Sequence, residues 1–419
     1  MQDKQGESDR SSEETGYDMP KIALDINVLD AARQRLEWVF DNCPQIYVSF
    51  SGGKDSSVLL HLAVDEAKKR GRKIGVLFID LEAQYKLTID HIQEMLELYK
   101  EYLDTYWVCL PMNLRNAVSV FEPQWICWDP TKKTDWVRQP PNNAITNIGY
   151  FPFFRSGMEF EEFVVDFGKW FSSDELTACL VGIRADESLN RFRTIARNKS
   201  MLQNLPWTTY TGGAVYNAYP IYDWQTRDIW IYNGKLGRIY NKLYDLMHRA
   251  GLSVHQQRIC QPYGDDQRKG LWLYHVIEPE TWSRVLARVN GANQGALYAQ
   301  ESGNILGRLK ITRPENHTWE SFAWLIIDSL PPATQEHYKN KIAVFIKWWH
   351  DHGYPIIPDE ADPKEEATRK VPSWRRICKA LLRNDYWCKG LSFSQHKSDA
   401  YKKYLKLMRR RRSEWKLGF

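Results

Sequence analysis

The chain has 419 residues, 43% of them hydrophobic, which is enough for two or three domains with buried cores. Its 57 basic and 52 acidic side chains leave a net charge of +5, too small by itself to indicate nucleic-acid binding. No apolar stretch approaches the ~20 residues of a membrane span, and residues 1–18, expected to be disordered, are no secretory signal, so a cytoplasmic protein is predicted.

Cysteine, histidine and tryptophan are distributed unevenly. The seven cysteines include no C-x-x-C pair, which favours a reducing compartment and gives zinc or an iron–sulfur cluster no support. The ten histidines form no H-x-x-x-H pattern, so no structural metal is predicted. All but one of the 18 tryptophans lie from Trp107 onward, which favours large aromatic surfaces or packing there.

A strand, a glycine turn and a helix start form the most informative segment. The apolar run Ile46–Phe50 predicts a buried strand, and Ser51-Gly52-Gly53-Lys54-Asp55-Ser56-Ser57 leads into an amphipathic helix. Such a turn offers backbone N–H groups and the positive end of a helix dipole to an anion. Lys54 adds a cation, so the segment predicts a phosphate-binding loop, although its spacing is not that of a Walker loop. The alternative is an ordinary strand-to-helix turn that uses glycine and a serine cap.

Further strands alternate with helices along the next part of the chain. Ile74–Ile79 predicts a buried strand with Asp80 at its end, a helix follows, and Tyr106–Leu110 predicts a third strand. This alternation predicts an α/β fold with a doubly wound, mostly parallel sheet. In such sheets ligands bind beyond the carboxyl ends of the strands, where both the glycine loop and Asp80 fall.

The remaining signals divide the chain into segments of different character. Prolines and tryptophans interrupt residues 122–172, which indicates a long ordered excursion over the active-site face. Strands are predicted at Ala178–Ile183 and Ala214–Ile221, and a helical, tryptophan-rich C-terminal region follows. The expected organisation is a disordered N-terminus (1–18), a nucleotide-binding domain (19–235), a helical extension (236–352), a linker (353–373) and a basic helical segment (374–419).

A second polar cluster follows the predicted strand at Ala178–Ile183. Gly182-Ile183-Arg184-Ala185-Asp186-Glu187-Ser188-Leu189-Asn190-Arg191 again places glycine, arginines, a carboxylate and a serine at a strand end. Arginine suits bidentate contacts to phosphate or sulfate, so this run could clamp the other end of a nucleotide. The alternative is a surface turn with a Glu187–Arg191 pair, worth a few tenths of a kcal/mol.

Together these motifs resemble the phosphoadenylylsulfate (PAPS) reductase family of the PP-loop ATP pyrophosphatases, in the adenine nucleotide α-hydrolase superfamily. Asp80 and the run from Pro220 to Trp230 occur in the order typical of that family, and the similarity covers roughly residues 25–235. The resemblance implies an adenine nucleotide such as ATP as ligand, with Mg²⁺ bridging its phosphates. It implies catalytic roles for Lys54, Asp55 and Arg184, and nucleotide contacts from Ser49, Phe50, Ser51, Gly52, Gly53, Ser56, Asp80, Gly182, Glu187, Ser188 and Arg191.

The departures from the family shape the expected function. The reductases' Glu-Cys-Gly-(Ile/Leu)-His segment is absent, which removes their nucleophile. The whole chain most resembles a phage- and plasmid-borne branch called immunoglobulin-binding regulator A, whose members are encoded beside a ParB/sulfiredoxin-like protein. We expect cleavage of ATP, or of a sulfonucleotide, between its α- and β-phosphates to adenylylate an acceptor. The alternatives are an inactive regulatory module that acts with the ParB-like partner, and a PAPS reductase or sulfur-transfer enzyme.

Two signals in the second part of the chain each allow more than one interpretation. Basic neighbours such as Arg258 would lower the pKa of Cys260 and make it a reactive thiol, but a partly buried structural cysteine is the simpler interpretation. The basic run 402–412, with nearby aromatic residues, could bind nucleic acid or the partner, or could be a solvated helix face.

Overall fold

The structure is a computed structural model. It describes residues 25–119, 122–196, 201–259, 261–264, 271–289, 313–330, 332–383, 385–386 and 388–393. The expected disordered N-terminus, Cys260 and the basic run 402–412 lie outside the described residues.

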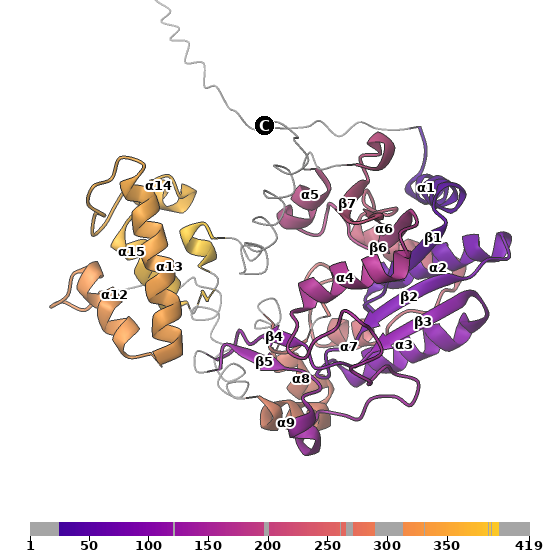
Figure 1. Ribbon diagram of the computed structural model, residues 1–419, viewed down its shortest axis with the longest axis horizontal. Coiled ribbons are helices and arrows are strands. Elements are labelled where there is room, and N and C mark those ends of the chain that lie inside the picture. The colour runs from indigo at the N-terminus through magenta and orange to yellow at the C-terminus, as the bar shows by residue number, and fades with distance from the viewer. Residues whose placement is uncertain are drawn as a thin grey trace, which may run out of the picture.

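A six-stranded sheet organises the larger part of the described chain (Figure 1). Its order is β3-β2-β1-β6-β8-β7, and every pairing is parallel except the hairpin of β7 with β8. The strands are β1 (Gln45–Ser49), β2 (Ile74–Ile79), β3 (Leu103–Val108), β6 (Thr177–Val181), β7 (Thr208–Gly212) and β8 (Val215–Ala218). Because β2 and β6 flank β1 on opposite sides, the strand order reverses there, which is where ligands bind in such sheets.

Helices cover both faces of the sheet, which confirms the predicted α/β class. Right-handed crossovers place α2 (Lys54–Lys69) and α3 (Lys86–Leu98) on one face. On the other face, α4 (Phe160–Ser172) packs aromatic side chains against Tyr47 and Tyr106. Helix α1 (Val28–Asn42) packs on α2.

The segment predicted as an excursion is ordered and contains regular elements. It includes β5 (Gln124–Ile126), which pairs with β4 (Asn113–Arg115), the short helix η2 (Pro130–Asp135) and α4. Its last part is therefore one of the helices that cover the sheet. The sequence analysis also missed β7, which precedes the predicted strand at Ala214–Ile221 and pairs with β8 in antiparallel fashion. The remaining short elements are α5 (Leu189–Ala196), η1 (Lys100–Tyr102) and η3 (Leu202–Asn204).

Two hydrophobic cores divide the helical C-terminal region. Helices α6 (Thr226–Leu236), α7 (Leu243–Arg249), α8 (Leu271–Ile277) and α9 (Pro279–Arg288) belong to the core of the sheet. A second core joins α12 (Trp319–Asp328), α13 (Pro332–His350), α15 (Trp374–Leu382) and η5 (Lys389–Leu391). Figure 1 shows these helices gathered in an orange and yellow lobe.

The lobe includes the interval that the sequence analysis assigned to a linker, residues 353–373. This interval holds α14 (Pro363–Thr368), and the buried Glu366 accepts hydrogen bonds from Ser373, Arg375 and Lys379. Its prolines misled the prediction because Pro363 occupies the first turn of a helix, where a missing N–H costs nothing. Within the described residues, no helix is both long and apolar enough to cross a membrane.

Candidate functional site

The glycine loop joins β1 to α2 at the point where the strand order reverses. Gly52 has a φ of +69°, and a Cβ at this position would lie 2.7 Å from Cγ1 of Ile92, so only glycine fits. The Asn241 amide, completely buried, donates to the Gly52 carbonyl at 3.1 Å and to the Thr88 hydroxyl at 3.0 Å. The loop conformation is thus fixed from α3 and from a residue 189 positions further along the chain.

Helix α2 begins at this loop, and few acceptors cap the N–H groups of its first turn. Gly53 is the N-cap residue and has no side chain to accept from the first turn. The Lys54 N–H donates to the Tyr244 hydroxyl at 3.0 Å. The N–H groups of Asp55 and Ser56 donate to no acceptor among the described residues. Unsatisfied amides at a helix N-terminus form an anion-binding site.

Three charged side chains converge at the first turn of α2. Arg184, at the end of β6, donates from Nε to Oδ1 of Asp55 at 2.5 Å, and its side chain is 1% exposed. The Lys54 ammonium lies 3.2 Å from the other Asp55 oxygen and is 8% exposed. Arg184 also lies 3.7 Å from Asp186, so two cations and two carboxylates meet here and their formal charges cancel. Of the three residues that the family resemblance assigns to catalysis, Lys54 and Arg184 thus both contact Asp55.

Gly182 brings the end of β6 against the loop. A Cβ on this glycine would lie 2.9 Å from both the backbone N and Cα of Ser56. The absence of a side chain lets the two strand ends approach each other, so the predicted second cluster meets the glycine loop.

Hydroxyl groups organise the interior of the loop. Ser51 Oγ lies 3.0 Å from Ser56 Oγ, and Ser56 Oγ also donates to the Gly53 carbonyl at 3.1 Å. Ser57 Oγ lies 2.8 Å from Nε2 of His91, whose pKa burial lowers to about 4, so this imidazole is neutral at pH 7. Of the other predicted contacts, Phe50 is buried and Ser49 half-buried beneath the loop.

The second cluster also contains the Glu187–Arg191 pair, which the sequence analysis gave as the sign of an ordinary surface turn. Arg191 Nε lies 3.6 Å from Oε2 of Glu187, and the Arg191 N–H donates to Ser188 Oγ at 3.3 Å at the start of α5. Arg258 donates to the Glu187 carbonyl at 3.2 Å, so the chain after α7 reaches this end of the sheet. Arg191 is half exposed.

Asp80 lies at the end of β2 as predicted, but its carboxylate is closed off. It accepts hydrogen bonds from Trp107 Nε1 at 2.9 Å, from the Glu82 N–H at 3.0 Å and from Arg138. Its side chain has no exposed surface. Asp80 thus positions Trp107 and Arg138, and both of its carboxylate oxygens accept hydrogen bonds from the protein.

Glu82 forms a second buried site beside Asp80, which the sequence analysis did not identify. It has a φ of +66° and accepts from Arg288 Nε at 2.7 Å, from the Trp128 N–H at 2.7 Å and from the Val137 N–H at 3.1 Å. The side chains of Glu82 and Arg288 are 0% and 1% exposed. This ion pair connects α9 to the segment that follows β2.

The described thiols are poor nucleophiles. All six described cysteines are buried, and burial raises the pKa of Cys43 to about 11 and the pKa of Cys179, Cys378 and Cys388 to about 12. Burial also raises the pKa of Cys109 and Cys127. These six groups are neutral thiols at pH 7.

Comparison with known families and relatives agrees with this arrangement. Residues 45–250 match the phosphoadenosine phosphosulfate reductase domain, and residues 251–363 and 354–402 match a domain of unknown function, DUF3440. The first part of the chain is thus similar to PAPS reductase domains, and this second region follows it. It is 45% identical to the Escherichia coli (strain K12) protein described as "Uncharacterized protein YbdN", over 94% of this chain and 97% of that one. The chain belongs to the family of that protein.

More distant similarities cover about half of the chain. The Methanocaldococcus jannaschii "Uncharacterized protein MJ0973" is 27% identical over 48% of this chain and 38% of that protein. A PAPS reductase from Candida auris in a phosphate complex is 16% identical, with a TM-score of 0.33, over 56% of this chain and 89% of that one. A Candida glabrata FMN adenylyltransferase with FMN and an ATP analogue is 17% identical, with a TM-score of 0.32, over 52% and 59%. TM-scores this low carry no inference about substrate.

Proposed function

We propose that this protein binds ATP or a close adenine nucleotide at the Ser51–Ser56 loop and cleaves it between the α- and β-phosphates. The observation that carries the proposal is the N-terminus of α2, where the open N–H groups of Asp55 and Ser56 lie in the same turn as the Lys54 ammonium. Backbone amides, a helix dipole and a lysine together favour a polyphosphate.

The proposed reaction is nucleotidyl transfer. An acceptor oxygen attacks the α-phosphorus, the bond to the bridging oxygen breaks, and pyrophosphate leaves while the acceptor keeps the adenylyl group. Lys54 and the loop amides would stabilise the charge that develops on the leaving pyrophosphate. Arg184, being enclosed, would act by holding Asp55 and with it the direction of the Lys54 ammonium.

Mg²⁺ fits this site only as a companion of the nucleotide. Within the described part of the chain, no group of three or more His, Cys, Asp or Glu side chains comes together to hold a metal. Asp55 is already paired with two cations. The ion would therefore be held mainly by phosphate oxygens, whose charge it would neutralise.

Reductase chemistry has less support. The family's cysteine segment is missing from the sequence, and the six described thiols are buried with a raised pKa. Release of sulfite from PAPS with thioredoxin or glutathione as reductant would contradict this assignment.

Calorimetric titration with ATP and with PAPS tests the proposal. Gly53→Asp places a carboxylate beside the open amides, and we expect at least tenfold weaker binding. Gly53→Ala is the matched control, because its Cβ would lie at ordinary contact distances, 3.4 Å from Ser51 Oγ and 3.5 Å from the Tyr244 hydroxyl, and adds no charge. If the wild-type protein binds neither nucleotide, the proposal fails. Chromatography of the products formed from ATP then separates a catalyst from a binding module.

We further propose that the basic run 402–412 engages a macromolecule, either nucleic acid or a ParB-like partner. This segment lies outside the described residues, and the support is its sequence, which ends in four consecutive arginines. Deletion of residues 402–419 should abolish that binding and leave nucleotide affinity unchanged. If nucleic acid is the target, the affinity should fall steeply with salt.

A further inference from the structure

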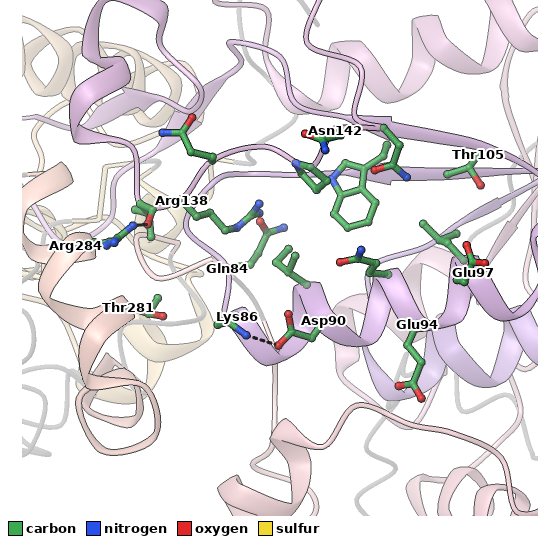
Figure 2. A pocket seen from close by; sticks show the side chains of 18 of the residues that line it. Gln84, Lys86, Asp90, Glu94, Glu97, Thr105, Arg138, Asn142, Thr281 and Arg284 are labelled. Atoms are coloured by element: carbon green, nitrogen blue, oxygen red, sulfur yellow. Dashed lines mark hydrogen bonds and ion pairs between the residues drawn. The ribbon is translucent and has the colours of Figure 1, made fainter.

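A large cleft lies at the β3 edge of the sheet, away from the glycine loop. Its volume is about 1120 Å³, and α3, β3, residues 137–143 and α9 line it (Figure 2). Helix α3 separates the two places, because Ile92 approaches Gly52 while Ile89 and Gln93 line the cleft. The cleft is therefore not part of the proposed nucleotide site.

The backbone of β3 has an open edge within this cleft. Ile145 donates to the Trp107 carbonyl at 2.7 Å, and its own carbonyl accepts from the Cys109 N–H at 3.0 Å. The backbone groups of residues 107 and 109 thus point away from β2, and alternation along the strand gives Thr105 the same direction. Thr105 is exposed and lines the cleft, and its backbone N–H and carbonyl have no hydrogen-bond partner among the described residues. In the part of the chain that the structure describes, this edge pairs only through the bridge of Ile145 with Val108.

The cleft is charged differently at its two ends. Near α9 it is lined by three basic side chains and two acidic ones, namely Lys86, Arg138, Arg284, Asp90 and Glu280. The other end is lined by Glu94, Glu97 and Lys100. Figure 2 shows the arginines and Lys86 apart from Glu94 and Glu97. Lys86 pairs with Asp90 at 2.8 Å, Lys100 with Glu97 at 2.5 Å, and Arg138 with Asp80. Among the described residues, the lining charges without an ion-pair partner within 4.0 Å are therefore Arg284 and Glu280 near α9 and Glu94 at the other end.

Helix α3 carries these charges against its own dipole. Its first turn contains Lys86 and no acid, and its last turn contains Glu97 and no base. Helix α2 shows the favourable order, with Asp55 in the first turn and Lys68 and Lys69 in the last. At the N-terminus the Glu278 carboxylate compensates, since it accepts hydrogen bonds from the Lys86 and Leu87 N–H groups at 2.8 and 3.0 Å.

We propose that this cleft binds an extended peptide segment of a partner protein, which adds a strand to the free edge of β3. The backbone groups of Thr105 would provide the main-chain hydrogen bonds. The peptide's acidic side chains would face Arg284, and its basic side chains would face Glu94. Carboxamides of Gln93 and Asn142 lie along the cleft and can both donate to and accept from a peptide. The thirteen residues of α3 span ~20 Å, the length of about six extended residues.

Panning of a phage-displayed random twelve-residue library on the full-length protein tests the proposal, with counter-selection on Thr105→Pro. Proline removes the outward N–H of an edge strand and leaves the β2–β3 ladder intact. Enriched peptides should bear acidic residues toward one end and basic residues toward the other. They should bind Thr105→Pro at least tenfold more weakly than wild type, and the matched Thr105→Ser variant within twofold of it. Failure to enrich any peptide, or equal binding to Thr105→Pro, would overturn the inference.

Two further measurements keep the test independent of how Thr105→Pro folds. The Glu94→Lys variant should weaken binding of a selected peptide about tenfold, and changing the peptide's basic residues to glutamate should restore it. Glu101→Lys, an exposed change outside the cleft lining, should have no effect. Hydrogen exchange should slow in residues 103–108 when the peptide is bound. Unchanged exchange there would place the peptide elsewhere and refute strand addition.

Discussion

Gly182→Ala is the sharpest perturbation of the junction between β6 and the glycine loop. The added methyl carbon would lie 2.9 Å from the backbone N and Cα of Ser56 and 3.1 Å from the carbonyl carbon of Asp55. These are backbone atoms of the first turn of α2, which Tyr244 and Asn241 hold from the other side. The new methyl group would thus be about 0.5 Å too close to backbone atoms, and no flexible side chain could move to make room for it. Overpacking of this kind costs about 1–3 kcal/mol.

Urea denaturation and calorimetric titration with ATP measure the two consequences. We expect the free energy of unfolding to fall by about 1–3 kcal/mol, and the affinity for ATP to fall at least tenfold as the first turn shifts. Gly234→Ala is the matched control, because a Cβ there meets nothing within 4 Å inside α6, and alanine should stabilise that helix by about 0.5–1 kcal/mol. A Gly182→Ala protein as stable as wild type, with unchanged ATP affinity, would refute the close-approach argument.

Three other predictions concern the buried polar groups. Burial lowers the pKa of His61 and of His91 to about 4, below the ~6.5 of an unfolded chain. Between about pH 6.5 and pH 4 the unfolded state binds more protons than the folded state. The free energy of unfolding should therefore fall by up to about 3 kcal/mol per histidine as the pH drops from 7 to 4. Urea titrations of a His91→Gln variant should show a weaker dependence of this free energy on pH. Arg288→Met should lower the free energy of unfolding by about 3–5 kcal/mol, because Glu82 stays buried and loses its ion-pair partner. Loss of the exposed Arg155 should change this free energy by less than about 0.5 kcal/mol. An equal effect of both substitutions would contradict the prediction. Ellman's reagent should modify at most one of the seven thiols before denaturation, and rapid modification of two or more would refute the burial of the described six.

Local chemistry made the fold and the loop predictable. The apolar strand before Ser51, the paired glycines and the amphipathic helix are neighbours in sequence, and their physical roles follow from residue type alone. The second cluster was found for the same reason, since Gly182 and Arg184 follow directly on a strand. Their contact with Asp55 and Ser56 requires the strand order, which spacing does not reveal.

The residues that hold the site were missed because their partners are remote in sequence. Tyr244 and Asn241 contact the loop across about 190 positions and belong to no recognisable local motif. Asp80 was placed correctly at the end of β2, but its partner Arg138 lies in the irregular segment before α4. A carboxylate at a strand end can face a ligand or the protein interior, and only the three-dimensional contacts distinguish the two.

The buried pair of Glu82 and Arg288 joins the two family regions. Glu82 lies in the part that matches the reductase domain, and Arg288 lies in α9, within the part of unknown function. Arg288 also donates to the Ile126 carbonyl at 2.8 Å, and both side chains are enclosed in the core of the sheet. Glu82 without this guanidinium would be a buried, uncompensated charge, which costs several kcal/mol. Helix α9 is therefore a structural requirement of the α/β domain, and the second hydrophobic core begins only with α12.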